Sequence, residues 1–147
     1  MSLKTLLYVS ESLLTVPDEE RQLAAIISVA RERNVALGLT GTIVSARGHF
    51  AQILEGSPAD VDLVMASIAR DPRHQGVNVL MAREIARRQF PGWPMNLAYA
   101  GKSFYVDRHI APLIGRAEAS PERLALTSQL LYLIHELSQP DPRKSIL

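Results

Sequence analysis

Residues 37–56, LGLTGTIVSARGHFAQILEG, contain two strand-like segments in close succession. Segments 37–45 and 49–55 are rich in apolar and β-branched residues. The short ARG between them carries Gly48, which can adopt the positive φ of a tight turn. We therefore predict a β-hairpin. Its second strand holds an amide, Gln52, among apolar neighbours, and burying an amide without a partner costs roughly 1–3 kcal/mol.

The segments around the hairpin alternate between strand and helix patterns. Residues 3–10 are typical of a strand. The acidic residues 18–20 complement the dipole at the start of a helix. One face of that helix is predicted to carry Leu23, Ile26, Ile27, Ala30 and Asn34. A second helix spans 57–71, with Ser57 as N-cap and Pro58 in its first turn. Its apolar stripe consists of Val61, Val64, Met65 and Ile68.

Two more predicted strands complete a sheet. Residues 77–85 form the first, and residues 93–100 form a fifth strand in which Pro94 can give no ladder hydrogen bond, so it belongs at an edge or a bulge. The order β-α-β-β-α-β plus one strand predicts an α+β, ferredoxin-like sandwich with its helices on one face.

The C-terminal part is predicted to add two helices that cover the other face of the sheet. They lie in residues 107–137, and the apolar side of the second carries Leu126, Leu130, Leu133 and Leu137. We expect a core domain over 1–100, a helical extension packed on the sheet over 101–137, and a flexible tail over 138–147.

Composition narrows the functional classes. The chain has 147 residues and is 47% hydrophobic and 21% charged, the composition of an ordinary globular protein. Its net charge of +1 gives no reason to expect nucleic acid or an anionic membrane as a partner. It has no cysteine, no signal peptide pattern and no membrane-spanning apolar run, so a cytoplasmic protein is expected. The four histidines lack metal-ligand spacing, and no GxSxG, Walker A or GxGxxG motif occurs, which argues against a metal site and a hydrolase.

A set of polar residues is predicted to meet beneath the two helices. The first and third strands of a ferredoxin-like sheet are usually neighbours, and period-two alternation brings Tyr8 and Gln52 close to each other on one face. Asn34 points into the same space, and Arg73 and His74 follow the second helix. Together these residues suit a planar ligand with a donor–acceptor edge.

Each member of this set also has a purely structural explanation. A buried tyrosine bonded to an amide is a common pair. Asn34 fits a plain C-terminal helix cap, Arg73 and His74 fit an exposed loop, and Trp93 fits a core or an interface. The set therefore leaves a structural role open beside ligand binding.

Five segments in order resemble a BLUF domain, the family that senses blue light using FAD. They are LLYVS, RNVALGLTG, FAQILEG, ARDPRHQGV and RRQFPGWPM, and the resemblance runs over about residues 3–100. It implies FAD as cofactor, with FMN as the other flavin to consider, and an isoalloxazine ring held between Ile26 and Ile68.

The resemblance also implies roles for single residues. Tyr8 would be the electron and proton donor, and Gln52 the amide between it and the flavin N5/O4 edge. Asn34 would bind the pyrimidine edge, and Arg73 and His74 the carbonyl side or the ribityl chain. Trp93 and Met95 would lie on the switchable fifth strand. The cofactor-binding set it implies is Tyr8, Ser10, Ile26, Asn34, Phe50, Gln52, Ile68, Asp71, Arg73, His74 and Met95.

The resulting hypothesis is a photoreceptor without enzymatic turnover. An amide donates on one side and accepts on the other, so a light-driven rearrangement can reverse its hydrogen bonds without a stable ion. We expect output through a downstream protein in trans, and a homo-oligomer. Two alternatives stay open: a flavin-free ferredoxin-like interaction or oligomerisation domain, and a small flavin-dependent enzyme.

Overall fold

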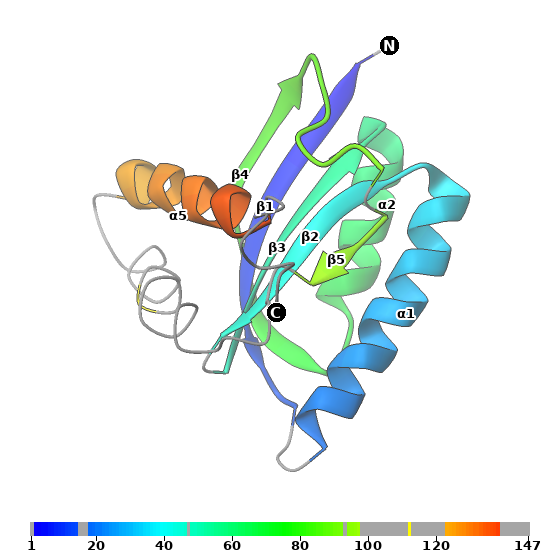
Figure 1. The fold of residues 1–147 in the computed structure, drawn as a ribbon, viewed down its shortest axis with the longest axis vertical. Helices are drawn as coiled ribbons and strands as arrows, with labels where there is room; N and C mark the ends of the chain where they lie inside the picture. The colour runs from blue at the N-terminus through cyan, green and yellow to red at the C-terminus, as the bar shows by residue number, and fades with distance from the viewer. Residues whose placement is uncertain are drawn as a thin grey trace, which may run out of the picture.

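Strands β1 and β3 lie side by side and antiparallel inside a five-stranded sheet with the order β4-β1-β3-β2-β5. The computed structural model describes residues 2–14, 18–46, 48–92, 94–97, 112 and 123–138. The strands are β1 (Leu3–Ser12), β2 (Thr40–Ala46), β3 (His49–Gly56), β4 (His74–Ile85) and β5 (Asn96–Leu97), and the helices are α1 (Glu19–Leu37), α2 (Pro58–Ala69) and α5 (Arg123–Ser138). Helices α1 and α2 cover one face of the sheet and α5 lies on the other (Figure 1). The predicted α+β plan is confirmed.

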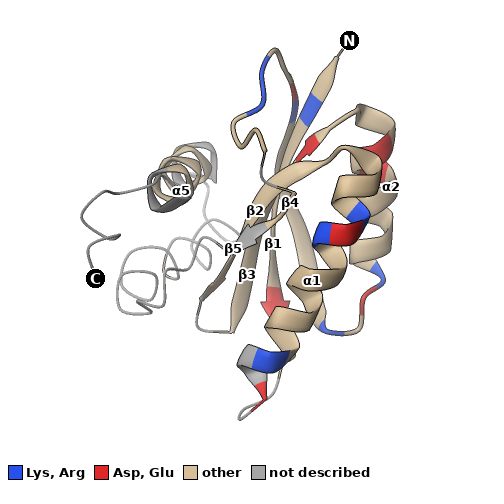
Figure 2. Ribbon diagram, turned by 45° about the vertical axis from the view of Figure 1, so that its right-hand side comes forward, with Lys and Arg blue, Asp and Glu red and all other residues tan. Residues whose placement is uncertain are grey.

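The predicted hairpin is formed by β2 and β3. Gly48 occupies its turn with a φ of 78°. Within the ladder, a Cβ on Gly41 would lie 2.0 Å from the carbonyl oxygen of Ile53, so no larger residue fits there without a shift. Alternation along the strands divides the core: Ile43 packs toward α1 and α2, and Val44 packs toward α5. In the strands, Lys, Arg, Asp and Glu lie near the ends (Figure 2).

The end of α1 differs from the prediction, which began the next strand at residue 37. The helix continues to Leu37 and is ended by Gly38, whose φ of 68° is left-handed. The N–H of Leu39 then donates to the carbonyl of Asn34 at 2.8 Å. A glycine in this conformation is the usual way to satisfy the last helical carbonyls, and β2 therefore starts at Thr40.

Strand β4 also begins earlier than predicted. It starts at His74 instead of residue 77 because β1 extends to Ser12, which pairs with His74. His74 is therefore a strand residue and not part of a loop.

Helix α2 agrees with the prediction: the Ser57 side chain accepts from the N–H of Asp60, and Pro58 stands in the first turn.

Helix α5 packs on the second face of the sheet through a stripe that includes the predicted Leu130. Leu130 and Ile134 are fully buried, Thr127 is nearly so, and Leu133 is only partly buried. The buried positions follow the spacing of three and four residues expected of one helix face, and the side chains of Leu126 and Leu137 lie outside the described residues. No helix in the described ranges is long and apolar enough to cross a membrane.

Several predictions fall on residues outside this description. They include most of the first predicted C-terminal helix, the tail after Ser138, and Trp93. Of the predicted fifth strand, Asn96 and Leu97 pair in parallel with β2. The division of the chain into a core, a helical extension and a tail stays a prediction.

Candidate functional site

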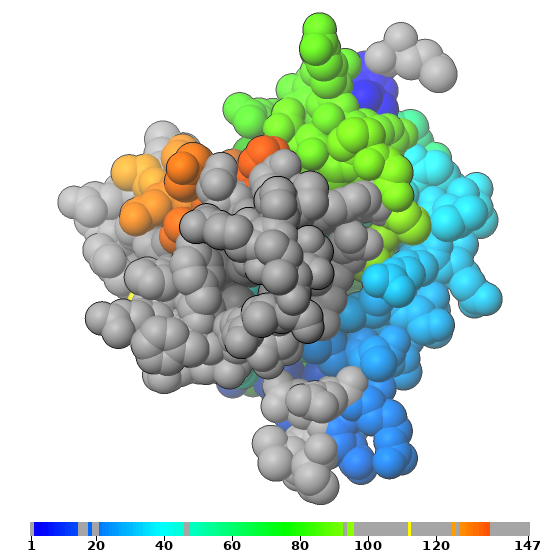
Figure 3. Space-filling model, in the orientation of Figure 1, coloured from blue at the N-terminus to red at the C-terminus, as the bar shows by residue number. Residues whose placement is uncertain are grey.

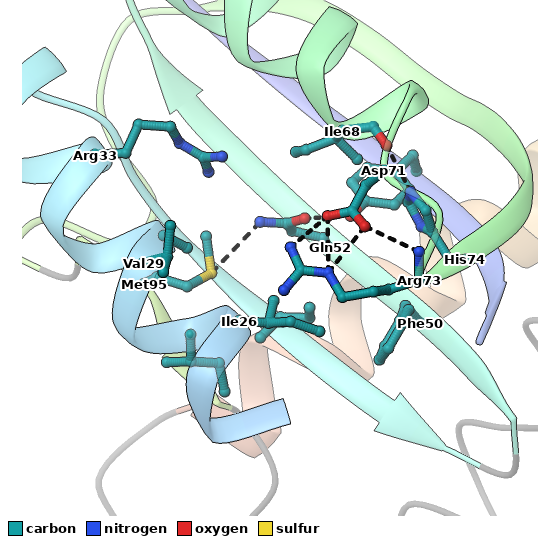
Figure 4. A pocket seen from close by; sticks show the side chains of 14 residues that line it. Ile26, Val29, Arg33, Phe50, Gln52, Ile68, Asp71, Arg73, His74 and Met95 are labelled. Atoms are coloured by element: carbon teal, nitrogen blue, oxygen red, sulfur yellow. Dashed lines mark hydrogen bonds and ion pairs between the residues drawn. The ribbon is translucent and has the colours of Figure 1, made fainter. Parts of the chain in front are cut away.

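A pocket lies between α1, α2 and the sheet, in the space where the sequence predicts the polar set. Figure 4 shows Gln52 near its centre, with side chains from both helices around it. Its lining residues are Tyr8, Ile26, Ile27, Val29, Ala30, Arg33, Ile43, Phe50, Gln52, Ile68, Asp71, Arg73, His74 and Met95. Nine of the eleven predicted cofactor-binding residues are among them; Ser10 and Asn34 are not. The binding roles of all eleven stay predictions.

Tyr8, Gln52 and Met95 form a buried relay at the floor of the pocket. The sheet register places Tyr8 directly opposite Gln52, which confirms their predicted proximity. The Tyr8 hydroxyl donates to Gln52 Oε1, and Gln52 Nε2 donates to Met95 Sδ at 3.6 Å. The three residues are 3%, 4% and 1% exposed. Since a thioether sulfur is only a weak acceptor, the amide is firmly bonded on one side and weakly on the other.

The Tyr8 phenol is held in its neutral form. Burial raises its pKa well above the usual value, the nearby charge of Arg33 opposes that shift, and Asp71 adds to it. Desolvation disfavours the phenolate because a charge is costly to bury. Tyr8 is therefore a proton donor to Gln52 over the whole physiological pH range.

Asp71 and Arg73 form an ion pair at the rim of the pocket. Arg73 Nε donates to Oδ1 at 2.9 Å and Nη2 to Oδ2 at 2.5 Å, and the Arg73 backbone N–H donates to Oδ1 at 2.9 Å. These hydrogen bonds lower the pKa of Asp71 and raise that of Arg73. The Arg73 side chain is 44% exposed, so the pair lies at the boundary between the pocket and solvent.

His74 connects β1 to the end of α2. Its Nε2 lies 2.6 Å from the carbonyl oxygen of Ile68, and its Nδ1 lies 2.8 Å from the Ser10 hydroxyl. A carbonyl oxygen only accepts, so Nε2 carries the proton. The ring also stands edge-on to Tyr8, with centroids 6.1 Å apart. Ser10 therefore acts on the pocket wall through His74.

Asn34 is fully buried beside the pocket. Its side-chain N–H donates to the carbonyl of Pro94 at 2.5 Å, and Arg33 Nε donates to its Oδ1 at 3.2 Å. At the end of α1 the backbone carbonyl of Asn34, and not its side chain, accepts from Leu39. The C-cap of α1 is Gly38, so the alternative of a plain C-terminal helix cap is wrong for Asn34.

Arg33 is the main pocket residue that the sequence reasoning missed. Its guanidinium lies beside the pocket opposite the Asp71–Arg73 pair (Figure 4), and burial lowers its pKa. A signal was present: Ile26, Ala30 and Arg33 follow the i, i+4, i+7 spacing of one helix face. Arg33 is the direct neighbour of Asn34, with which the predicted face ends.

The donor set favours a planar, polar-edged organic molecule. The walls are apolar, the floor offers one amide, and cationic groups stand at two sides. Within the described ranges no group of three or more His, Cys, Asp and Glu side chains could hold a metal ion. The pocket can therefore bind and orient a ring system, and the relay can move hydrogen bonds beneath it.

Comparison with known proteins gives consistent matches. A family model described as sensors of blue-light using FAD matches residues 3–96. Photoactivated adenylate cyclase subunit beta of Euglena gracilis is 34% identical over 96 residues, which is 64% of this chain and 11% of that protein. The blue light- and temperature-regulated antirepressor BluF of Escherichia coli is 31% identical over 90 residues, 60% of this chain and 21% of the antirepressor.

A solved structure is similar over nearly the whole of both chains. The dark-state structure of BlrB, a BLUF protein, is 30% identical with a TM-score of 0.69, and the match covers 90% of this chain and 96% of that one. The curated relatives are much longer, since this chain spans only 11% of the cyclase subunit. The similarity to them is confined to one part of each.

Proposed function

This chain belongs to the BLUF family, the sensors of blue light using FAD, and on that premise we propose that it is a blue-light photoreceptor that holds a flavin between α1 and α2. The observation that carries the proposal is the buried relay of Tyr8, Gln52 and Met95 at the floor of the pocket. The relay joins a neutral phenol, an amide that is firmly bonded on one side only, and a weak acceptor.

The residues of the pocket fit a flavin. Ile26 and Ile68 offer apolar surfaces from the two helices, as a flat ring requires. Gln52 offers an amide to the polar edge of the ring, and Arg33 offers a guanidinium that suits a carbonyl or phosphate oxygen. When bound, the flavin supplies the absorption of blue light and an excited state that takes up an electron.

The protein's part in the switch is proton movement and amide rotation. Tyr8 holds its proton at Oη because burial disfavours the phenolate. From there the proton can move only toward Gln52 Oε1, its hydrogen-bond acceptor. The bond from Gln52 Nε2 to Met95 is weak, so little holds the amide in its present orientation once the bond to Tyr8 is disturbed. Reversal of the amide changes which atoms it presents to the ring.

The output of the switch is a signal and not a turnover. BLUF domains are sensors, and in relatives with cyclase activity the catalytic part is separate from the region that matches this chain. We propose that this chain binds FAD in preference to FMN, is cytoplasmic, forms a homo-oligomer, and passes its signal to a partner protein in trans. We also propose that the chain consists of a flavin-binding core over 1–100, a helical extension packed on the sheet over 101–137, and a flexible tail over 138–147.

A light-minus-dark absorption spectrum of the purified protein tests the proposal. We expect a yellow protein whose flavin band shifts to longer wavelength under blue light and returns in darkness without added substrate. Flavin released by heating and separated by chromatography distinguishes FAD from FMN. A colourless protein that binds no added flavin would favour the interaction-domain alternative, and a change that requires a substrate would favour an enzyme.

A further inference from the structure

The segment that brings Met95 into the pocket is fixed at both of its ends by side chains that take no part in the relay. We call residues 88–92, 94 and 95 the strap. It follows β4 and runs toward β5 beside the C-terminal half of α1 (Figure 1). In the space-filling view, the segment after β4 lies directly against that part of α1 (Figure 3).

The first anchor is a buried carboxylate on β3. Glu55 is fully buried, its Oε2 accepts from the backbone N–H of Gln89 at 2.8 Å, and its Oε1 accepts from that of Phe90 at 2.7 Å. The Thr40 hydroxyl also donates to Oε1, at 2.9 Å. Charge-assisted hydrogen bonds of this kind are roughly twice as strong as neutral ones. The same strand thus carries the switch amide and the anchor of the strap.

The second anchor comes from α1. Arg31 Nε donates to the carbonyl of Met95 at 2.7 Å, and the Asn34 side chain donates to the carbonyl of Pro94. The two residues are three apart on the helix and therefore share a face. They hold the backbone at the point where the Met95 sulfur reaches the amide of Gln52.

The hydrogen bonds that anchor the strap are stronger than the bond between Gln52 and Met95 that they support. A thioether accepts weakly, so the bond from Gln52 cannot by itself keep Met95 in place. If the amide of Gln52 reverses, its oxygen faces a sulfur that has no proton to give, and that attraction is lost. The anchors then decide how far the strap departs and how readily it returns.

We infer that Arg31 and Glu55 are positioning residues of the switch: by fixing the strap they hold Met95 against Gln52 and speed the return to the dark arrangement. This inference rests on the proposed photoreceptor function. It assigns a role to a buried carboxylate and to an exposed arginine, neither of which is among the residues that line the pocket.

Two variants each remove one side chain that anchors the strap; Arg31→Met leaves the bond from Asn34 to the Pro94 carbonyl in place. Arg31→Met keeps the aliphatic stem and removes the donor, and because Arg31 is exposed the variant is expected to fold. Glu55→Gln keeps the size but turns an N–H₂ group toward a backbone donor. Arg21→Met is the matched control, since Arg21 is an exposed arginine ten residues earlier on the same helix, about 15 Å away.

The first measurement is the rate at which the light-induced red shift disappears in darkness. We expect a return about tenfold slower in each variant, which corresponds to about 1.4 kcal/mol in the barrier, and an unchanged rate in the control. A return in Arg31→Met that is as fast as in the wild type, or faster, overturns the role in the switch. This result decides the matter even where Glu55→Gln fails to fold.

The second measurement does not need the photocycle. Trp93 is the single tryptophan of the chain and stands in the sequence between two residues of the strap, Gly92 and Pro94. We expect acrylamide to quench its fluorescence more strongly in both variants than in the wild type, at equal flavin occupancy. Unchanged quenching overturns the anchoring. If the wild type shows no light-induced shift, the proposed function fails, whereas the quenching comparison still decides whether the anchors hold the strap.

Discussion

The hydrogen bond between Tyr8 and Gln52 is expected to show strong coupling in a double-mutant cycle. Both side chains are almost fully buried. In Gln52→Leu the Tyr8 hydroxyl loses its acceptor, and in Tyr8→Phe the Gln52 oxygen loses its donor. A buried polar group without a partner costs about 1–3 kcal/mol, so each single variant should lower the free energy of unfolding by that amount.

The double variant leaves neither group unpaired at this contact. Its loss of stability should therefore be smaller than the sum of the two single losses by about 2 kcal/mol. Urea unfolding measures this difference, at equal flavin occupancy because a bound ligand adds its own stabilisation. The control Tyr132→Phe changes a side chain that is 63% exposed and should stay within about 0.5 kcal/mol of the wild type.

The same variants separate the switch from the binding of flavin. Tyr8→Phe and Gln52→Leu should both retain flavin and lose the reversible red shift, and Gln52→Leu should absorb slightly to the blue in darkness because the ring has lost a bond. Tyr132→Phe should photocycle normally. Strictly additive stability losses would refute the coupled pair, and a wild-type shift in Gln52→Leu would refute its role as the switch.

Three further variants or conditions test other parts of the structure. Asn34→Ala should purify with markedly less flavin, and full occupancy measured from the absorbance ratio would contradict its proposed contact with the ring. Gly41→Ala places a Cβ 2.0 Å from the Ile53 carbonyl oxygen and should lower the free energy of unfolding, measured in urea, by about 1–3 kcal/mol. Unchanged stability would mean that β2 packs less closely against β3 at this position. Because burial raises the pKa of Tyr8, the folded phenol keeps its proton while the unfolded one ionises near pH 10, so stability should fall as pH rises above about 10. Unfolding curves between about pH 9 and 11 should show a shallower decline in Tyr8→Phe, and an equal decline would argue against a buried neutral phenol.

Much of the fold and part of the site follow from local sequence patterns. The β2–β3 hairpin could be predicted because its apolar segments are short and Gly48 stands between them. The meeting of Tyr8 and Gln52 could be predicted because alternation assigns each side chain to a face, and strand order then makes them neighbours. The predicted boundaries between α1 and β2 and at the start of β4 differ from the structure. Gly38 caps α1 after Leu37, and the pairing of β1 with β4 extends to His74.

The residues that the sequence did not reveal are those whose partners are backbone groups or distant elements. Periodicity shows which face a side chain takes, but any residue type can offer the N–H or carbonyl that a buried side chain binds. The contact of Glu55 with the backbone of Phe90, and that of Arg31 with the carbonyl of Met95, depend on the path of an irregular segment between two strands. Local pattern together with the strand order therefore decides the meeting of Tyr8 and Gln52, whereas only the tertiary path of the chain decides what holds Met95 against Gln52.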